Sequence, residues 1–212
     1  MEQNQMAVAP QNELQPSEYT TQLTDTKSLN ALVKLAGMYS NSAIVPDAYH
    51  GNRDNCFVAC EMANRMGVSP IVVMQNLYIV QGKPAWSGQA CISLINGTRL
   101  FSPLKFIFVG EKGQPNWGCY VQATRLSDGE VLTGTVVDMQ LAQAEGWTSK
   151  RGSKWLTMPE QMLQYRAAAF FARVHCPHAL MGLQTADEVR DVRGYEEEEK
   201  KTIVINMEVD KE

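Results

Sequence analysis

A stretch of basic residues lies beside a tryptophan in the second half of this chain. Lys150, Arg151 and Lys154 fall in a glycine-containing loop, and Arg166 and Arg173 follow on a predicted helix. Seven residues make almost two helical turns, so the two arginines are expected to share an exposed face. A row of cations binds the phosphates of a polyanion and releases its counterions, whatever its sequence. The stretch therefore indicates a surface that holds a nucleic acid by its backbone.

The charges of this chain are segregated along its length. The whole chain carries −4, yet residues 147–175 hold five Lys and Arg against a single acid, Glu160. From Asp187 to the end, ten acids face five bases. Polyanion binding would therefore come from a local patch and not from net charge. The alternative interpretation is that the charge runs are solvated surface and tail.

Tryptophans lie next to several of these cations. Trp155 follows Lys154, and Trp86 comes soon after Lys83. Aromatic rings provide faces on which single-stranded bases stack. The alternative is that these tryptophans belong to the core and the cations only face solvent.

Motifs of the common catalytic sites are missing from the sequence. It has no phosphate-binding loop G-x-x-x-x-G-K-[ST], no G-x-G-x-x-G, and no G-x-S-x-G or H-E-x-x-H. A zinc site built from Cys56, Cys60 and the segment 175–178 lacks a standard spacing. The acids before the tail are scattered. We therefore predict no catalytic residue, no metal and no cofactor, with a metal-dependent nuclease as an alternative.

Composition is typical of a globular intracellular protein. Of 212 residues, 44% are apolar, and the five cysteines are an odd number without a disulfide framework. The first residues are polar and do not form a signal peptide, and no run of about 20 apolar residues occurs. These features predict free thiols and a cytoplasmic location.

Hydrophobic periodicity and turn residues predict helices, then strands, then helices. Helices are expected near 26–40, 54–66, from 70, 87–95, 138–145, 157–175 and 185–190, and strands at 77–80, 104–109, 117–126 and 131–137. A turn is expected at 81–84. This order predicts an α+β fold, an antiparallel three-stranded meander flanked by helices.

Two details of this prediction concern single residues. Thr157-x-x-Glu160 has the spacing of a capping box at the start of the long helix. The apolar stripe of that helix is expected to comprise Leu163, Ala167, Phe170 and Val174. We predict one DNA-binding domain over 26–193, preceded by a disordered arm (1–25) and followed by an acidic mobile tail (194–212).

Two segments resemble the RecT family of phage single-strand annealing proteins. One is AGMYSNSAIVPDAYHGNRDNCFVACEMANRMGVSPIVVMQNLYIVQGKPAW, and the other is SKWLTMPEQMLQYRAAAFFARVHCP. The first is similar to the family's pattern of a helix, an "lvP.ay.g" segment, a helix ending in "G.sP" and a "GkP" strand. The second is similar to its Trp, Met and basic-helix signature. The resemblance covers about residues 28–193.

The resemblance implies ATP-independent annealing of complementary DNA strands in homologous recombination. It implies a RecT/Redβ-like fold, distantly Rad52-like, with DNA in a basic groove between sheet and helices, and assembly into a homo-oligomeric ring or helical filament. By position, DNA-binding residues are expected in the loop and long helix, with Arg173 on the same face and two more at the "GkP" strand: Lys150, Arg151, Lys154, Gln161, Arg166, Arg173, Lys83 and Trp86. Trp155, beside Lys154, is a further candidate because a base can stack on its ring.

Other partners and other functions stay open at this point. The family's members engage a phage exonuclease or a host single-strand binding protein, and the acidic tail is a candidate for that contact. The alternatives to annealing are a single-stranded DNA-binding protein that does not anneal, a metal-dependent nuclease, and a phage assembly protein whose basic face binds an acidic partner.

Overall fold

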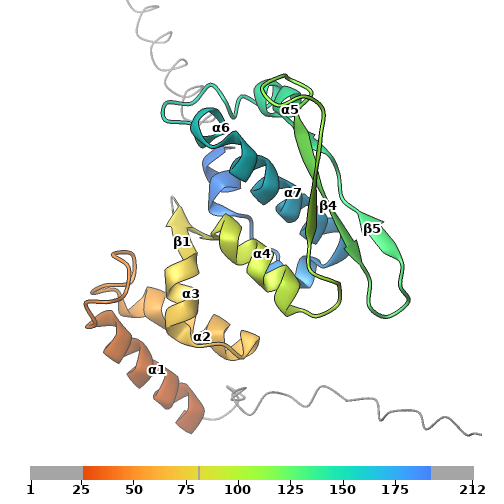
Figure 1. Ribbon diagram of the computed structural model, residues 1–212. Coiled ribbons are helices and arrows are strands. Elements are labelled where there is room, and N and C mark those ends of the chain that lie inside the picture. Colours follow the sequence, from red (N-terminus) through yellow and green to blue (C-terminus); the bar gives the residue numbers. More distant parts are fainter. Residues whose placement is uncertain (1–25, 81, 192–212) are drawn as a thin grey trace, which may run out of the picture. The chain divides into compact units, whose positions relative to one another are not determined.

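The structure, a computed structural model, describes residues 26–80 and 82–191 (Figure 1). Its elements in chain order are α1 (Thr26–Ser40), α2 (Arg53–Met66), α3 (Pro70–Asn76), β1 (Leu77–Val80), β2 (Lys83–Trp86), α4 (Gly88–Gly97), β3 (Lys105–Val109), β4 (Gly118–Thr124), β5 (Val131–Thr133), β6 (Val137–Asp138), α5 (Met139–Ala144), α6 (Lys154–Thr157), α7 (Pro159–His175) and the 3₁₀ helix η1 (Pro177–Leu180). The fold is α+β, as predicted.

The described residues divide into two compact units, with the boundary between Gln75 and Asn76. The sequence predicted a single domain over 26–193. The predicted arm (1–25) and the predicted tail (194–212) lie outside the described residues.

The first unit is helical, and α1 packs against α2. The predicted limits of α2 are confirmed because both ends carry strong local signals. The side chain of Asn52 accepts a hydrogen bond from the Asn55 amide at 3.0 Å, and Gly67 ends the helix with φ +65°. A left-handed residue at this place favours glycine, which has no Cβ to clash.

The second unit contains the predicted meander. Strand β4 lies between β3 on one side and β5 and β6 on the other, and every pairing is antiparallel. In the predicted strand 117–126, the side chains of alternate residues are buried, as predicted: Trp117, Cys119, Val121 and Ala123. The predicted strand 131–137 is interrupted at Gly134, where an added Cβ would lie 3.4 Å from Phe171.

Helix α7 packs across β4, and α4 packs against α7 (Figure 1). The apolar stripe predicted for α7 is partly wrong. Leu163 and Ala167 are buried, but the side chain of Val174 is 70% exposed. The face that is buried includes three consecutive alanines, Ala167–Ala169, together with Phe171 and Arg166. Small residues allow the helix to approach its neighbours closely, so the buried face is wider than an apolar stripe predicts.

Strands β1 and β2 form a hairpin, and the predicted turn at 81–84 is therefore too long. Lys83 and Pro84 belong to β2 and pair with Val80 and Ile79. Trp86 at the end of β2 is 2% exposed, and its indole Nε1 donates to the Leu180 carbonyl at 3.2 Å. The hairpin is thus tied to the C-terminal part of the second unit.

The capping box predicted at Thr157-x-x-Glu160 is wrong. Thr157 already belongs to α6, so it cannot adopt the extended conformation of an N-cap. The N-cap of α7 is Met158, which makes no side-chain capping hydrogen bond, and Pro159 occupies the first turn. Glu160 instead forms an ion pair with Lys112 at 2.8 Å.

Among the described residues, no helix by itself has the length and apolar character needed to cross a membrane. The bent pair formed by α2 and α3 meets those two criteria only when its helices are taken together.

All five cysteines are free and buried. Burial raises the pKa of the Cys91 thiol to about 12 and that of Cys60, Cys119 and Cys176 to about 11. It also raises the pKa of Cys56. Because the thiolate is the reactive form, these side chains are inert packing groups in the folded protein.

We therefore expect the folded protein to resist thiol reagents. At pH 8 a thiol with a pKa of about 11 is ionised to only about a thousandth. Titration with a colourimetric disulfide reagent should show no fast-reacting thiol in native buffer and five in denaturant. One cysteine that reacts within seconds in native buffer would contradict the buried placement.

Candidate nucleic-acid interface

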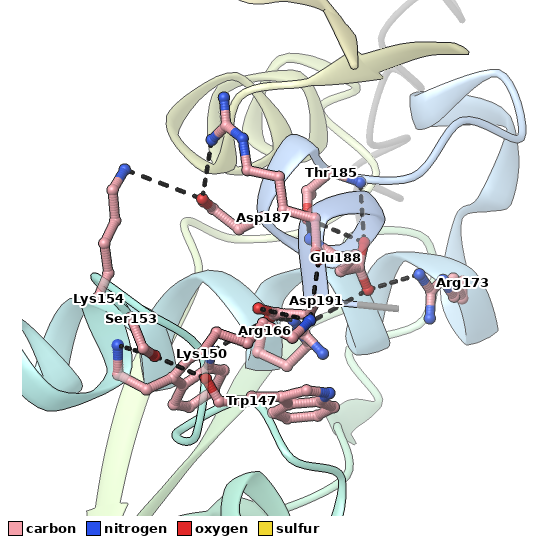
Figure 2. Close-up of polar contacts among 12 residues, drawn as sticks. Trp147, Lys150, Ser153, Lys154, Arg166, Arg173, Thr185, Asp187, Glu188 and Asp191 are labelled. Atoms are coloured by element: carbon pink, nitrogen blue, oxygen red, sulfur yellow. Dashed lines mark hydrogen bonds and ion pairs between the residues drawn. The ribbon is translucent and has the colours of Figure 1, made fainter. Parts of the chain in front are cut away.

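Residues 186–191 form a helix that carries Asp187, Glu188 and Asp191, and we call it the acidic helix. Its carboxylates point toward the basic residues predicted from the sequence (Figure 2). The backbone amide and hydroxyl of Thr185 donate to Glu188 at 2.8 and 2.9 Å, and the Glu188 amide donates back to the Thr185 hydroxyl at 3.4 Å. This reciprocal pair is a capping box, so the T-x-x-E spacing has its expected role here and not at Thr157.

Buried Arg166 on α7 is the centre of a cluster of aromatic and acidic side chains (Figure 2). Its guanidinium donates to Asp191, and its Nε lies 4.0 Å from a carboxylate oxygen of Glu188. Its Cζ lies 3.8 Å from the centre of the Trp147 ring and 5.5 Å from that of Trp155. The Trp155 indole donates to Asp191 at 3.1 Å. These contacts offset the cost of burying a charge.

Burial acts on the pKa of both charged partners at the centre of this cluster. It raises the pKa of Asp191, against the opposing effects of Arg166, Trp155 and Lys150. It lowers the pKa of Arg166, against the opposing effects of Glu188 and Asp191. Desolvation is therefore the largest cost for each group. A pair of this kind determines which groups meet more than it adds net stability.

Two further cations of the predicted row are held by the acidic helix or the residues beside it. Arg173 donates to Glu188. Lys150 donates to the backbone carbonyl of Arg190 at 2.9 Å and lies 4.0 Å from Asp191. Both contacts fix the basic loop and α7 to the acidic helix.

The prediction that the arginine row is exposed is wrong for Arg166, whose side chain is 4% exposed. Trp155 and Trp86, predicted to stack on bases, are 1% and 2% exposed, so their ring faces are covered in this structure. Helical spacing places Arg166 and Arg173 on one face but does not tell which face is buried. The roles of these residues in DNA binding remain predictions.

A groove of about 280 Å³ lies beside the acidic helix. Its polar lining consists of Ser87, Gln89, Lys154, Gln161, Asp187 and Arg190. Its volume falls slightly below the usual range of small-molecule pockets, roughly 300–1,000 Å³.

The two groove cations share one carboxylate. Oδ1 of Asp187 lies 3.9 Å from Lys154 Nζ and 3.4 Å from Arg190 Nη1. Both cationic side chains are 52% exposed, so solvent weakens these ion pairs. Lys154 and Arg190 are therefore open to solvent, whereas the side chain of Arg166 is buried.

Two tyrosines complete the groove. Tyr78 of β1 is 44% exposed, and the Arg190 guanidinium lies 5.9 Å from its ring centre. Tyr165 of α7 accepts a hydrogen bond from the Gln161 amide at 2.6 Å. Its ring lies against Gly88, where an added Cβ would come within 2.4 Å of a ring carbon. Glycine at this position therefore allows the ring to rest on α4.

The structure brings two of the predicted site residues, Lys154 and Gln161, into the groove lining. Arg151 and Lys83 are exposed but do not line the groove. Sequence reasoning did not select Tyr78, Tyr165 or Arg190. The Asp187-x-x-Arg190 spacing on the predicted helix was a signal for Arg190, while the two tyrosines join the site only through tertiary packing.

Within residues 26–80 and 82–191, no three His, Cys, Asp or Glu side chains are grouped so that they could hold a metal ion. The candidates weighed from the sequence, near Cys56 and near His175, therefore do not assemble into such a group.

Comparison of the chain with protein-family models, with curated proteins and with solved structures found no match. The class of protein is therefore inferred from the geometry of the groove and from the resemblance of residues 28–193.

Replacing Arg166 by Ala is expected to destabilise the protein by about 3–5 kcal/mol, because it leaves Asp191 and Glu188 buried without their cation. Urea unfolding followed by tryptophan fluorescence measures this. Exposed Arg151→Ala is the control and should change the free energy of unfolding by less than about 0.5 kcal/mol. A similarly small effect of Arg166→Ala would contradict the structural role of the cluster.

Replacing Gly88 by Ala is expected to cost about 1–3 kcal/mol, because the new methyl group must displace the Tyr165 ring. Gly97 lies in the same helix, α4, with no atom within 4 Å of an added Cβ. Gly97→Ala is thus a matched control and should leave stability unchanged or raise it slightly. Thermal unfolding of both variants compares them, and equal melting temperatures would refute the close contact.

Proposed function

We propose that this protein is an ATP-independent single-strand annealing protein of the RecT/Redβ type, which holds DNA by its phosphates and promotes pairing of complementary strands. The observation that carries the proposal is the groove in which Lys154 and Arg190, both half exposed, lie beside the exposed ring of Tyr78. The resemblance of residues 28–193 to the RecT family supports the same function.

The groove residues match the requirements of sequence-independent binding. Lys154 and Arg190 contact phosphates, which position a strand without reading its bases. Tyr78 provides a ring face for one base, and base–aromatic stacking tolerates any sequence. The amides of Gln89 and Gln161 supply neutral hydrogen bonds to the sugar–phosphate backbone.

A single groove binds a DNA strand with low affinity, because its two cations face one acid and leave a net charge of only +1. Several subunits whose grooves are aligned along one strand would bind it with much higher affinity, because linked sites act at a high effective concentration. The proposal therefore includes a homo-oligomer. A phage exonuclease or a host single-strand binding protein remains the proposed cooperating partner, as the resemblance implies.

The proposal predicts annealing in the absence of ATP and metal. Complementary oligonucleotides with a fluorophore and a quencher should pair faster with the protein than alone, with chelator present. Binding without acceleration would identify the alternative, a protein that covers single strands without annealing them. Cleavage of labelled DNA only after magnesium or manganese is added would identify the nuclease alternative.

Lys154→Ala and Arg190→Ala should each weaken binding to all single-stranded sequences. Each should also reduce the slope of log K against log salt by about 0.7, the value for one phosphate contact on a single strand. Fluorescence anisotropy at several salt concentrations measures both effects. Lys112→Ala removes an exposed lysine outside the groove lining and is the control. Equal slopes for all variants would remove the groove from the binding surface.

A further inference from the structure

Among the residues that line the groove, Asp187 is the one that carries a negative charge. Its oxygen Oδ1 faces both Lys154 and Arg190, at 3.9 and 3.4 Å. Its own side chain is 15% exposed, while those of the two cations are 52% exposed. A carboxylate oxygen therefore lies where an anion bound by both cations would place one of its own oxygens.

Both ion pairs are loose. Charge-assisted hydrogen bonds between nitrogen and oxygen are about 2.7–2.9 Å long, and neither distance is that short. Lysine has three donor hydrogens and arginine has five, so one shared oxygen leaves most of them available. The two cations can thus turn from Asp187 to another oxygen without breaking a tight bond.

The other acids of the acidic helix have structural tasks that Asp187 does not share. Glu188 forms the capping box, and Asp191 holds Arg166 and Trp155. The apolar anchors of the helix are Ala186 and Val189, which belong to a buried cluster with Ala85. Loss of the Asp187 charge therefore leaves the cap and these anchors in place.

We infer that Asp187 is an internal counterion of the groove, which competes with the phosphates of a bound strand and so limits affinity. This inference rests on the proposed function. Lys154, Arg190 and Asp187 together carry a net charge of +1, so a strand bound in the groove loses the counterions of about one phosphate and not of two. Binding therefore releases fewer ions than the number of phosphate contacts suggests. A limited grip also favours release of the paired product.

The inference is tested with the full chain and the isosteric variant Asp187→Asn. Binding of a fluorescent single-stranded oligonucleotide is measured by anisotropy across a range of salt concentrations. The variant should bind several-fold more tightly at low salt. Its salt dependence should be steeper by about 0.7, because the loss of one negative charge lets the groove neutralise one more phosphate.

Two controls separate competition from a simple change of charge or fold. Glu111→Gln removes the same charge from an exposed residue outside the groove lining and should leave the slope unchanged. Lys154→Ala combined with Asp187→Asn should return the slope to about that of the unmodified protein, because both have the same net charge in the groove. Thermal unfolding of each variant checks the fold, and Asp187→Ala provides a second uncharged variant with a residue of high helix propensity.

The outcomes distinguish this inference from the proposed function. Binding by the unmodified protein, with tighter and steeper binding by both Asp187 variants, supports both. Binding by the unmodified protein, with equal or weaker binding by folded Asp187 variants, refutes the competitor role and makes Asp187 a residue that positions the cations. No binding by any of these proteins refutes both the function and the inference.

Discussion

The arrangement of the second unit depends on one buried guanidinium. Arg166 contacts the ring of Trp147, which begins the basic loop, and Trp155, which lies in α6. Through Asp191 it also holds the acidic helix. A buried cation is tolerated only where all of its partners are present. The cluster therefore specifies where loop and helices lie, and so it determines the shape of the neighbouring groove.

This constraint divides the cations of the basic stretch into two groups. Arg166 and Lys150 are largely buried and contact the acidic helix, while Arg173 donates to the buried Glu188 of that helix and keeps a side chain that is 44% exposed. Lys154 and Arg190 make loose, solvent-screened pairs and keep most of their donors available. A count of positive charges along the chain overstates the charge that a ligand meets, because part of that charge is neutralised inside the fold.

Local signals predicted much of the fold. The Asn52 cap and the left-handed Gly67 defined α2, and the alternation from Trp117 to Ala123 identified the buried face of β4. These features depend on residues close together in the sequence. The candidate site was predicted less well. Lys154 and Gln161 line the groove, but burial of Arg166 and Trp155 follows from partners in the acidic helix, which periodicity within one helix does not reveal.

The two T-x-x-E motifs show why such a prediction fails. The spacing is the same at Thr157 and Thr185, but only Thr185 is free to take an extended backbone before its helix. At the first motif, Thr157 is the last residue of α6, so it cannot serve as the N-cap of the next helix. Competition between neighbouring elements thus decides between two equal local signals.

The long sequence separation of the central contacts has a consequence for folding. Arg166 precedes Asp191 by 25 residues, and Trp86 precedes its partner Leu180 by 94. The ribosome releases the N-terminal side first, so the arginine emerges well before its carboxylate. Until Asp191 is available, burial of the Arg166 guanidinium is unfavourable, so the cluster around it closes only after that residue has been synthesised. Such non-local contacts make folding slower than helix formation alone would allow.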